Sequence, residues 1–211
     1  SKVLDYACAS LQSHLPLSAE GYKCSTEDLL HALLGVAAQG GTLESVCADL
    51  NIVHAETIRG YLNEQLTPEI LPELERSLNA ALAAEIPTRL WRRTQHIALD
   101  LHDRPYYGKQ TQEDGLWIRS KARDGTTRFY RIATAYVMYD GLRVTLALHF
   151  YLPDNKPATV LAILLERVQE LGIGVRRLFL DKGFAGIDCL EYLDQHHWPA
   201  IIACTIRGKK G

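Results

Sequence analysis

The sequence has no apolar run that approaches the roughly 20 residues needed to span a bilayer. Its start also lacks a basic segment followed by a long apolar core, so we expect neither a signal peptide nor a membrane partner. The cysteines are few, odd in number and without a CxxC pair, which disfavours a zinc site and a disulfide framework. We therefore expect every cysteine to be a small buried residue of a cytoplasmic protein: Cys8, Cys24, Cys47, Cys189 and Cys204.

The net charge of −2 hides an asymmetry along the chain. Residues 1–90 hold 5 Lys/Arg and 12 Asp/Glu, which gives a net charge of −7. Residues 91–211 hold 18 Lys/Arg and 13 Asp/Glu, which gives a net charge of +5. Only the second half has the charge that attracts a polyanion. We predict a small helical domain over 1–90 and a second domain over 91–211. Their boundary is expected between Pro87 and Thr94, after a last helix over 72–86.

Helical periodicity dominates the first domain. Ser25 followed by Asp28 predicts a helix N-terminus, and leucines at helical spacing continue from there. Residues 43–50 predict a short helix, residues 51–53 a tight turn, and the stretch around Ile58 a second helix, which is a helix-turn-helix pattern. Because this region is acidic and offers a single arginine on its outer face, two interpretations stay open: a DNA-reading unit or a structural hairpin.

From Gln95 the pattern alternates with the period of a strand. "HIALDLH" predicts a strand that carries Asp100 on the side away from its leucines. The turn pairs Asp124–Gly125 and Asp140–Gly141 predict two hairpins. Further expected segments are a polar loop over 103–115, a helix over 157–171, a strand over 175–181, a helix over 186–197 and a buried last strand over 199–206. Antiparallel strands followed by helix–strand–helix–strand predict an α/β fold with a mixed sheet.

The motif "LFLDKGFAG" ends an apolar strand on Asp181. Read alone, this aspartate is as readily the N-cap of the next helix as a metal ligand. If its strand lies parallel to the strand that carries Asp100, the two carboxylates converge at the carboxyl end of the sheet. Carboxylate oxygens suit Mg²⁺ or Mn²⁺, and two such ions about 3.5–4 Å apart can promote displacement at a phosphodiester.

The segments "IALDLHDRPYYGK", "TAYVMYDGLRVTLALHFYLP" and "LFLDKGFAG" together resemble DDE transposases of prokaryotic insertion sequences. The resemblance covers about residues 90–211 and implies a ribonuclease-H-like fold. It implies that Asp100, on the first core strand, and Asp181, after the fourth, hold two Mg²⁺ (or Mn²⁺) ions. It further implies cleavage and joining of double-stranded DNA at element ends and target, by a homodimer in a synaptic complex.

The family's third acid is a glutamate on a helix beyond the fifth core strand, and this chain ends at "IRGKKG". The resemblance therefore implies a C-terminally truncated catalytic domain that is inactive alone, with the third acid beyond Gly211. Glu166 and Glu170, on the helix after the third core strand, are a remote substitute, whereas Glu113 and Glu191 do not match the family's position. The alternative function is a non-catalytic DNA-binding or assembly module derived from a transposase.

Basic residues near the predicted site and on the helical hairpin are candidate DNA contacts: Lys182, Lys121, Arg123, Arg128 and Arg59. Asp103 is interpreted as a loop residue before a proline, with replacement or assistance of Asp100 as its alternative role. Tyr106 and Tyr107 either stack on DNA or pack at the end of the sheet, and the sequence favours neither.

Overall fold

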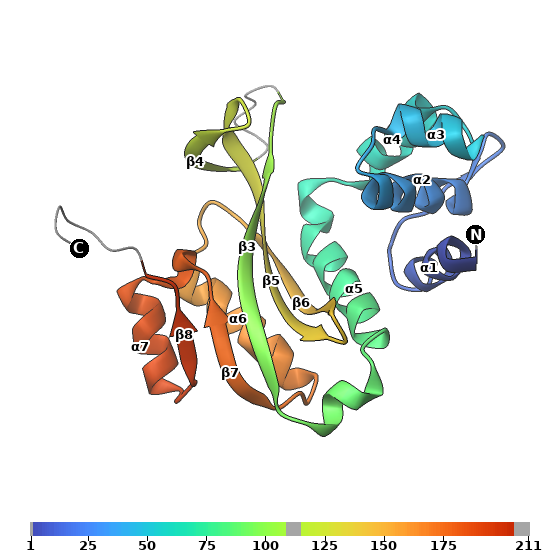
Figure 1. Ribbon diagram of the computed structural model, residues 1–211. Helices are drawn as coiled ribbons and strands as arrows, with labels where there is room; N and C mark the ends of the chain where they lie inside the picture. The colour runs from blue at the N-terminus through green and yellow to red at the C-terminus, as the bar shows by residue number, and fades with distance from the viewer. Residues whose placement is uncertain (1, 109–114, 205–211) are drawn as a thin grey trace. The chain divides into compact units, whose positions relative to one another are not determined.

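A computed structural model describes residues 2–108 and 115–204 of the chain (Figure 1). The chain divides into two compact units, Ser1–Ala81 and Leu82–Gly211. This division lies within the helix Leu71–Ala84, before the boundary that the sequence suggested. The reason is that Ile86 and Leu90 are both buried in the core of the second unit.

The first unit consists of short helices and one very short hairpin. The helices are α1 (Lys2–Gln12), α2 (Thr26–Gln39), α3 (Leu43–Leu50), α4 (Ala55–Gln65), the 3₁₀ turn η1 (Pro68–Ile70) and α5 (Leu71–Ala84). The antiparallel strands β1 (Glu20–Gly21) and β2 (Cys24–Ser25) pair between α1 and α2. The core of this unit is formed by Leu17, Ala19, Cys24, Leu29, Ala32, Cys47, Ala55 and Ile58.

Local capping explains where these helices begin and end. Ser25 and Asp28 form a capping box at the start of α2, as the sequence predicted. Gly40 ends α2 in the left-handed region, with φ 66°. Asn51 adopts the same region between α3 and α4, with φ 52°. The predicted pair of short helices around a tight turn is therefore confirmed as local structure.

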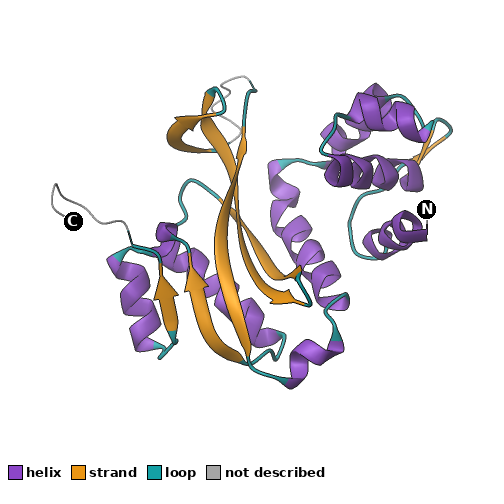
Figure 2. Cartoon of the chain, viewed as in Figure 1, coloured by secondary structure: helices purple, strands orange, loops and turns teal. Residues whose placement is uncertain are grey.

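The second unit is a mixed sheet with helices (Figure 2). Its strands are β3 (Gln95–Pro105), β4 (Ile118–Arg123), β5 (Thr126–Tyr139), β6 (Leu142–Tyr151), β7 (Val175–Leu180) and β8 (Ala200–Ile202). Its helices are α6 (Pro157–Glu170) and α7 (Ile187–Gln195), with 3₁₀ turns η2 (Thr88–Arg92) and η4 (Lys182–Phe184).

The strand order across the sheet is β6–β5–β3–β7–β8, and β4 pairs with the N-terminal part of β5. Pairing is antiparallel from β6 to β3 and parallel from β3 to β8. This is the mixed sheet that the sequence predicted, and it is consistent with the ribonuclease-H-like fold that the resemblance implied. Both predicted hairpin turns are present, and φ is positive at Asp124, Gly125, Asp140 and Gly141, as a type I′ turn requires.

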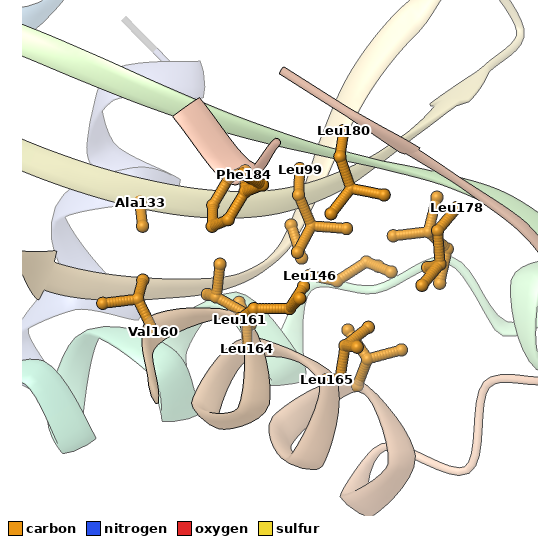
Figure 3. Close-up of a cluster of buried hydrophobic side chains, with 14 of the residues drawn as sticks. Leu99, Ala133, Leu146, Val160, Leu161, Leu164, Leu165, Leu178, Leu180 and Phe184 are labelled. Carbon is orange, nitrogen blue, oxygen red and sulfur yellow. The ribbon is translucent and has the colours of Figure 1, made fainter. Parts of the chain in front are cut away.

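Helix α6 packs on one face of the sheet and closes the main core (Figure 3). Its buried side chains lie against buried residues of the central strands, and the core includes Leu99, Ala133, Leu146, Val160, Leu161, Leu164, Leu165, Leu178, Leu180 and Phe184. The helix predicted over 157–171 is present with Pro157 as its first residue, and Gly172, just beyond its end, has φ 71°.

Three expectations about the second unit and the cysteines were wrong. Strand β3 continues to Pro105, into the segment expected to be a loop, because it pairs with β5 as far as Phe129. Strand β8 is not buried: Ile201 is 49% exposed, because β8 has one neighbouring strand among the described residues. Cys204 is exposed just after it, whereas burial raises the pKa of the four other thiols.

None of the described helices has the length and apolar character to cross a bilayer.

Candidate metal and nucleic-acid site

Two predicted site residues lie at the same level of adjacent strands because β3 and β7 pair in parallel. The register aligns Ala98 with Phe179 and Leu99 with Leu180. The backbone N–H of Asp181 then donates to the carbonyl oxygen of Leu99 at 3.2 Å, which extends the ladder by one residue. Asp100 and Asp181 thus follow directly after an aligned leucine pair on adjacent strands. The parallel pairing on which the sequence made the convergence of the two carboxylates conditional is therefore present.

Strand alternation places Asp100 on the face of the sheet opposite Leu99. Leu99 and Leu180 are buried toward α6, so Asp100, the next residue of β3, turns to the opposite face. Asp181 lies after the end of β7, where strand alternation no longer applies, and it lines a cavity together with Leu101 and Asp103. Phe179 is 40% exposed, so the face that carries Asp100 is not covered like the α6 face. We call it the acid face, defined by Ala98 and Asp100 on β3 with Phe179 on β7.

Asp100 has an arginine beside it. Its side chain is 38% exposed, and Oδ2 lies 3.7 Å from Nη1 of Arg143. The guanidinium of Arg143 also donates from Nη2 to the hydroxyl of Thr134 at 2.7 Å. It lies 3.8 Å from the ring centroid of Tyr136. Because an exposed ion pair is weak, a carboxylate with this exposure and one neighbouring cation can exchange that partner for a metal ion.

Asp181 caps the turn that follows β7. Its Oδ1 accepts a hydrogen bond from the N–H of Lys182 at 2.6 Å. The cap interpretation is therefore correct, and it is compatible with metal binding because a carboxylate has about four acceptor sites. Gly183 and Phe184 fix this turn to the core: Phe184 is fully buried, and a Cβ at Gly183 would lie 2.5 Å from Cδ1 of Leu101.

The cavity that Asp181 lines has a volume of about 610 Å³. It is lined by Leu101, Asp103, Ser120, Lys121, Ala122, Arg123, Arg131, Asp181, Lys182 and Gly183. Four of these residues are cations and two are carboxylates, so the cavity has a positive balance and suits an anion. Asp100 is not among the described residues that line it, whereas Asp103 is.

Asp103 is the most buried carboxylate of this region, with a side chain 7% exposed. Arg131 donates to it in a fork, from Nε to Oδ1 at 2.6 Å and from Nη2 to Oδ2 at 3.0 Å. Arg123 also pairs with Oδ2. Hydrogen bonding to Asp103 raises the pKa of Arg131. Asp103 is thus a strand residue with two arginine partners rather than a loop residue, because β3 extends past it.

The predicted DNA contacts fall into three environments. Lys121, Arg123 and Lys182 line the cavity. Arg128 donates to the carbonyl oxygen of Gly108 at 3.2 Å and lies over the ring of Trp117. Arg59, in the first unit, pairs with two glutamates of its own unit, Glu44 and Glu56.

The two tyrosines after β3 differ in their surroundings. Tyr106 stacks with Trp117 at 6.4 Å between ring centroids and meets Tyr130 edge-on at 5.1 Å. The hydroxyl of Tyr107 donates to the carbonyl oxygen of Asp124 at 2.6 Å, while 69% of the residue remains exposed. Trp117 also lines a second cavity, of about 540 Å³, together with Arg131.

The sequence interpretation missed Arg131 and Arg143. Each is an arginine in an alternating strand, and such residues usually extend into solvent. A pairing register was needed to place them beside Asp103 and Asp100, and no local motif carries that information.

The described residues contain no group of three or more His, Cys, Asp or Glu side chains placed to hold a metal ion. The candidate donors are the carboxylates of Asp100 and Asp181, and such oxygen donors fit Mg²⁺ or Mn²⁺. Glu113 lies outside the described residues. Glu166 is exposed on α6 near Tyr192 of α7, whose pKa is raised first by burial and then by this glutamate.

The sequence matches no protein-family model and no curated protein. Among solved structures, the chain is similar to a piggyBac transposase synaptic complex with hairpin DNA, at 14% identity and a TM-score of 0.47, over 99% of this chain and 42% of that one. It is also similar to a Mos1 transposase paired-end complex with the left transposon end, at 12% identity and a TM-score of 0.34, over 87% and 60%. The chain spans less than two thirds of either protein, and likeness at this level assigns no activity to it.

Proposed function

We propose that this chain is part of a DNA transposase of the DDE type that resembles those of prokaryotic insertion sequences. The observation that carries the proposal is the parallel register of β3 and β7, in which Asp100 and Asp181 each follow one residue of the aligned pair Leu99 and Leu180. This register supports a site shared by two residues more than eighty positions apart in the sequence, near the carboxyl end of β7, where open α/β sheets bind their ligands.

The proposed roles follow from the donor chemistry of the two acids. Asp100 and Asp181 are the residues that would hold the divalent cations, Mg²⁺ or Mn²⁺, two in a complete site. When bound, such ions activate the attacking oxygen and stabilise the leaving oxygen at a phosphodiester. The turn fixed by Phe184 positions Asp181, and the β3–β5 pairing positions Asp100. Rigid placement of this kind is what in-line phosphoryl transfer needs most from a protein.

The partner we propose is double-stranded DNA, at the element ends and at the target, bound by a homodimer. Support for a DNA partner is the cluster of Lys121, Arg123 and Lys182 around the cavity beside Asp181. Phosphate oxygens are the groups that such lysines and arginines contact. Arg128 extends the same basic region along β5, and Arg59 is the one proposed contact in the first unit.

A second candidate function is a DNA-binding or assembly module without catalysis. It is favoured by the arginine partners of two carboxylates: Arg143 lies beside Asp100, and Arg123 and Arg131 both pair with Asp103. Carboxylates with such partners are occupied by arginine, and the excess of cations around the cavity can bind DNA phosphates without a metal ion.

DNA binding is tested by the salt dependence of affinity for a duplex. Replacing Lys121 and Lys182 together by glutamine should make the slope of log K against log[salt] less negative by about 0.9 for each phosphate that the variant no longer neutralises. The measurement is fluorescence anisotropy with a labelled duplex over a series of salt concentrations. Arg59→Gln tests the one proposed contact in the first unit, and a slope less negative by about 0.9 there would support the inclusion of that unit in the interface. An unchanged slope in the double lysine variant would contradict the proposed surface.

A further inference from the structure

Arg143 connects three adjacent strands on the acid face. It starts on β6, donates to Thr134 of β5 at 2.7 Å, lies over Tyr136 of β5, and approaches Asp100 of β3 at 3.7 Å. Neither the family resemblance nor the predicted DNA contacts include this residue. Its position follows from the antiparallel pairing of β5 with β3 on one edge and with β6 on the other.

The guanidinium of Arg143 is fixed before any ligand arrives. Stacking on the ring of Tyr136 and the hydrogen bond to Thr134 restrain its plane. Its side chain nevertheless remains 43% exposed. A guanidinium has five N–H donors in a rigid fork that matches phosphate oxygens, so a fixed and accessible one is suited to bind a phosphodiester.

We propose that Arg143 binds a DNA phosphate on the acid face, and that without DNA it is the counterion of Asp100 and competes with a divalent cation for that carboxylate. The proposal rests on the proposed function, because it takes Asp100 as a cation ligand and DNA as the partner. It adds Arg143 to the proposed DNA contacts, and it adds a coupling between the binding of DNA and the binding of the cation.

The coupling follows from charge. A cation on Asp100 and the guanidinium of Arg143 repel each other, because both would lie near the same carboxylate. A phosphate between them attracts both and removes that repulsion. DNA should therefore tighten cation binding, and by linkage the cation should tighten DNA binding by the same factor.

The solvent exposure of Asp100 and Arg143 limits how strongly the arginine competes with a cation for the carboxylate. Asp100 and Arg143 are 38% and 43% exposed, and the charged atoms are 3.7 Å apart. Exposed pairs of this kind contribute little, so removing the arginine should tighten cation binding by about two- to fivefold and not by orders of magnitude.

The test measures Mn²⁺ binding to the whole chain by calorimetry, first without DNA. Arg143→Gln and Arg143→Met should bind Mn²⁺ about two- to fivefold more tightly than wild type. Arg176→Gln, which removes an exposed arginine of β7, should leave Mn²⁺ affinity unchanged. Arg143→Met retains an apolar stem for the ring of Tyr136, so it decides the result if the glutamine variant folds poorly.

The second arm measures duplex affinity at saturating Mn²⁺. Both neutral variants should show a salt slope less negative by about 0.9, whereas Arg143→Lys should keep the wild-type slope because it keeps the charge. Equal Mn²⁺ affinity in wild type and both neutral variants, or an unchanged slope, would overturn the role of Arg143. Asp181→Asn distinguishes a failure of the Arg143 inference from a failure of the proposed function. If that variant binds Mn²⁺ as wild type does, the proposed function itself is wrong.

Discussion

Replacing Phe184 by alanine should lower the free energy of unfolding of the second unit by about 3–5 kcal/mol. Phe184 is fully buried in the main core, where it lies with Leu99 and Val160 (Figure 3). Truncation removes its burial and leaves a cavity that a close-packed interior cannot fill without strain. A loss of this size is a large share of the 5–15 kcal/mol or so that usually stabilises a domain.

The measurement is urea unfolding followed by tryptophan fluorescence. All three tryptophans, Trp91, Trp117 and Trp198, lie in the second unit, so the signal reports that unit separately from the first. Phe179→Ala is the matched control, because Phe179 is 40% exposed on the acid face and its truncation should cost much less. Equal losses of stability in the two variants would mean that Phe184 does not anchor the turn after Asp181.

Replacing Asp103 by asparagine should destabilise the second unit by about 2–3 kcal/mol. Breaking a fully buried ion pair typically costs about 3–5 kcal/mol, because the remaining charge is uncompensated, and partial exposure reduces that figure. The side chain of Asp103 is 7% exposed, whereas Arg131 is 21% and Arg123 is 51% exposed. Arg131 therefore carries most of the expected loss.

A double-mutant cycle isolates this pair. Arg131→Gln in the Asp103→Asn background should cost less than Arg131→Gln in wild type, because the carboxylate partner has already gone. The readout is again urea unfolding by tryptophan fluorescence. Additive losses of stability in the cycle would show that the fork between Arg131 and Asp103 contributes no coupling energy, contrary to the geometry.

Much of the fold could be predicted because its signals are local. Alternation in "HIALDLH", the Asp-Gly turn pairs and the Pro157 start of α6 each depend on a few neighbouring residues, and each appears in the structure. The exposed edge at β8 could not be predicted in this way. Its sequence is apolar whether or not another strand pairs with it, so exposure of Ile201 depends on the neighbours that the sheet provides.

The same distinction, between local signals and contacts that depend on strand pairing, applies to the candidate site. Asp100 and Asp181 could be proposed from motifs, and Asp181 was rightly considered a cap as well. The arginine partners could not, because Arg131 reaches Asp103 from 28 positions away and Arg143 reaches Asp100 across β5. Such contacts depend on the strand register. A shift of one residue would move every side chain of a strand to the opposite face of the sheet.

The pairing of Asp100 with Asp181 is tested most directly by Mn²⁺ binding, measured by calorimetry on wild type and on single Asp→Asn variants. Wild type should bind, and Asp100→Asn and Asp181→Asn should each bind about tenfold or more weakly. Asp140→Asn is the charge-matched control, since asparagine accepts the positive φ of that turn, and it should bind as wild type does. Asp103→Asn should also retain binding. Undiminished binding in Asp100→Asn or Asp181→Asn would contradict the account, and loss of binding in Asp103→Asn with retention in Asp100→Asn would move the first ligand to Asp103.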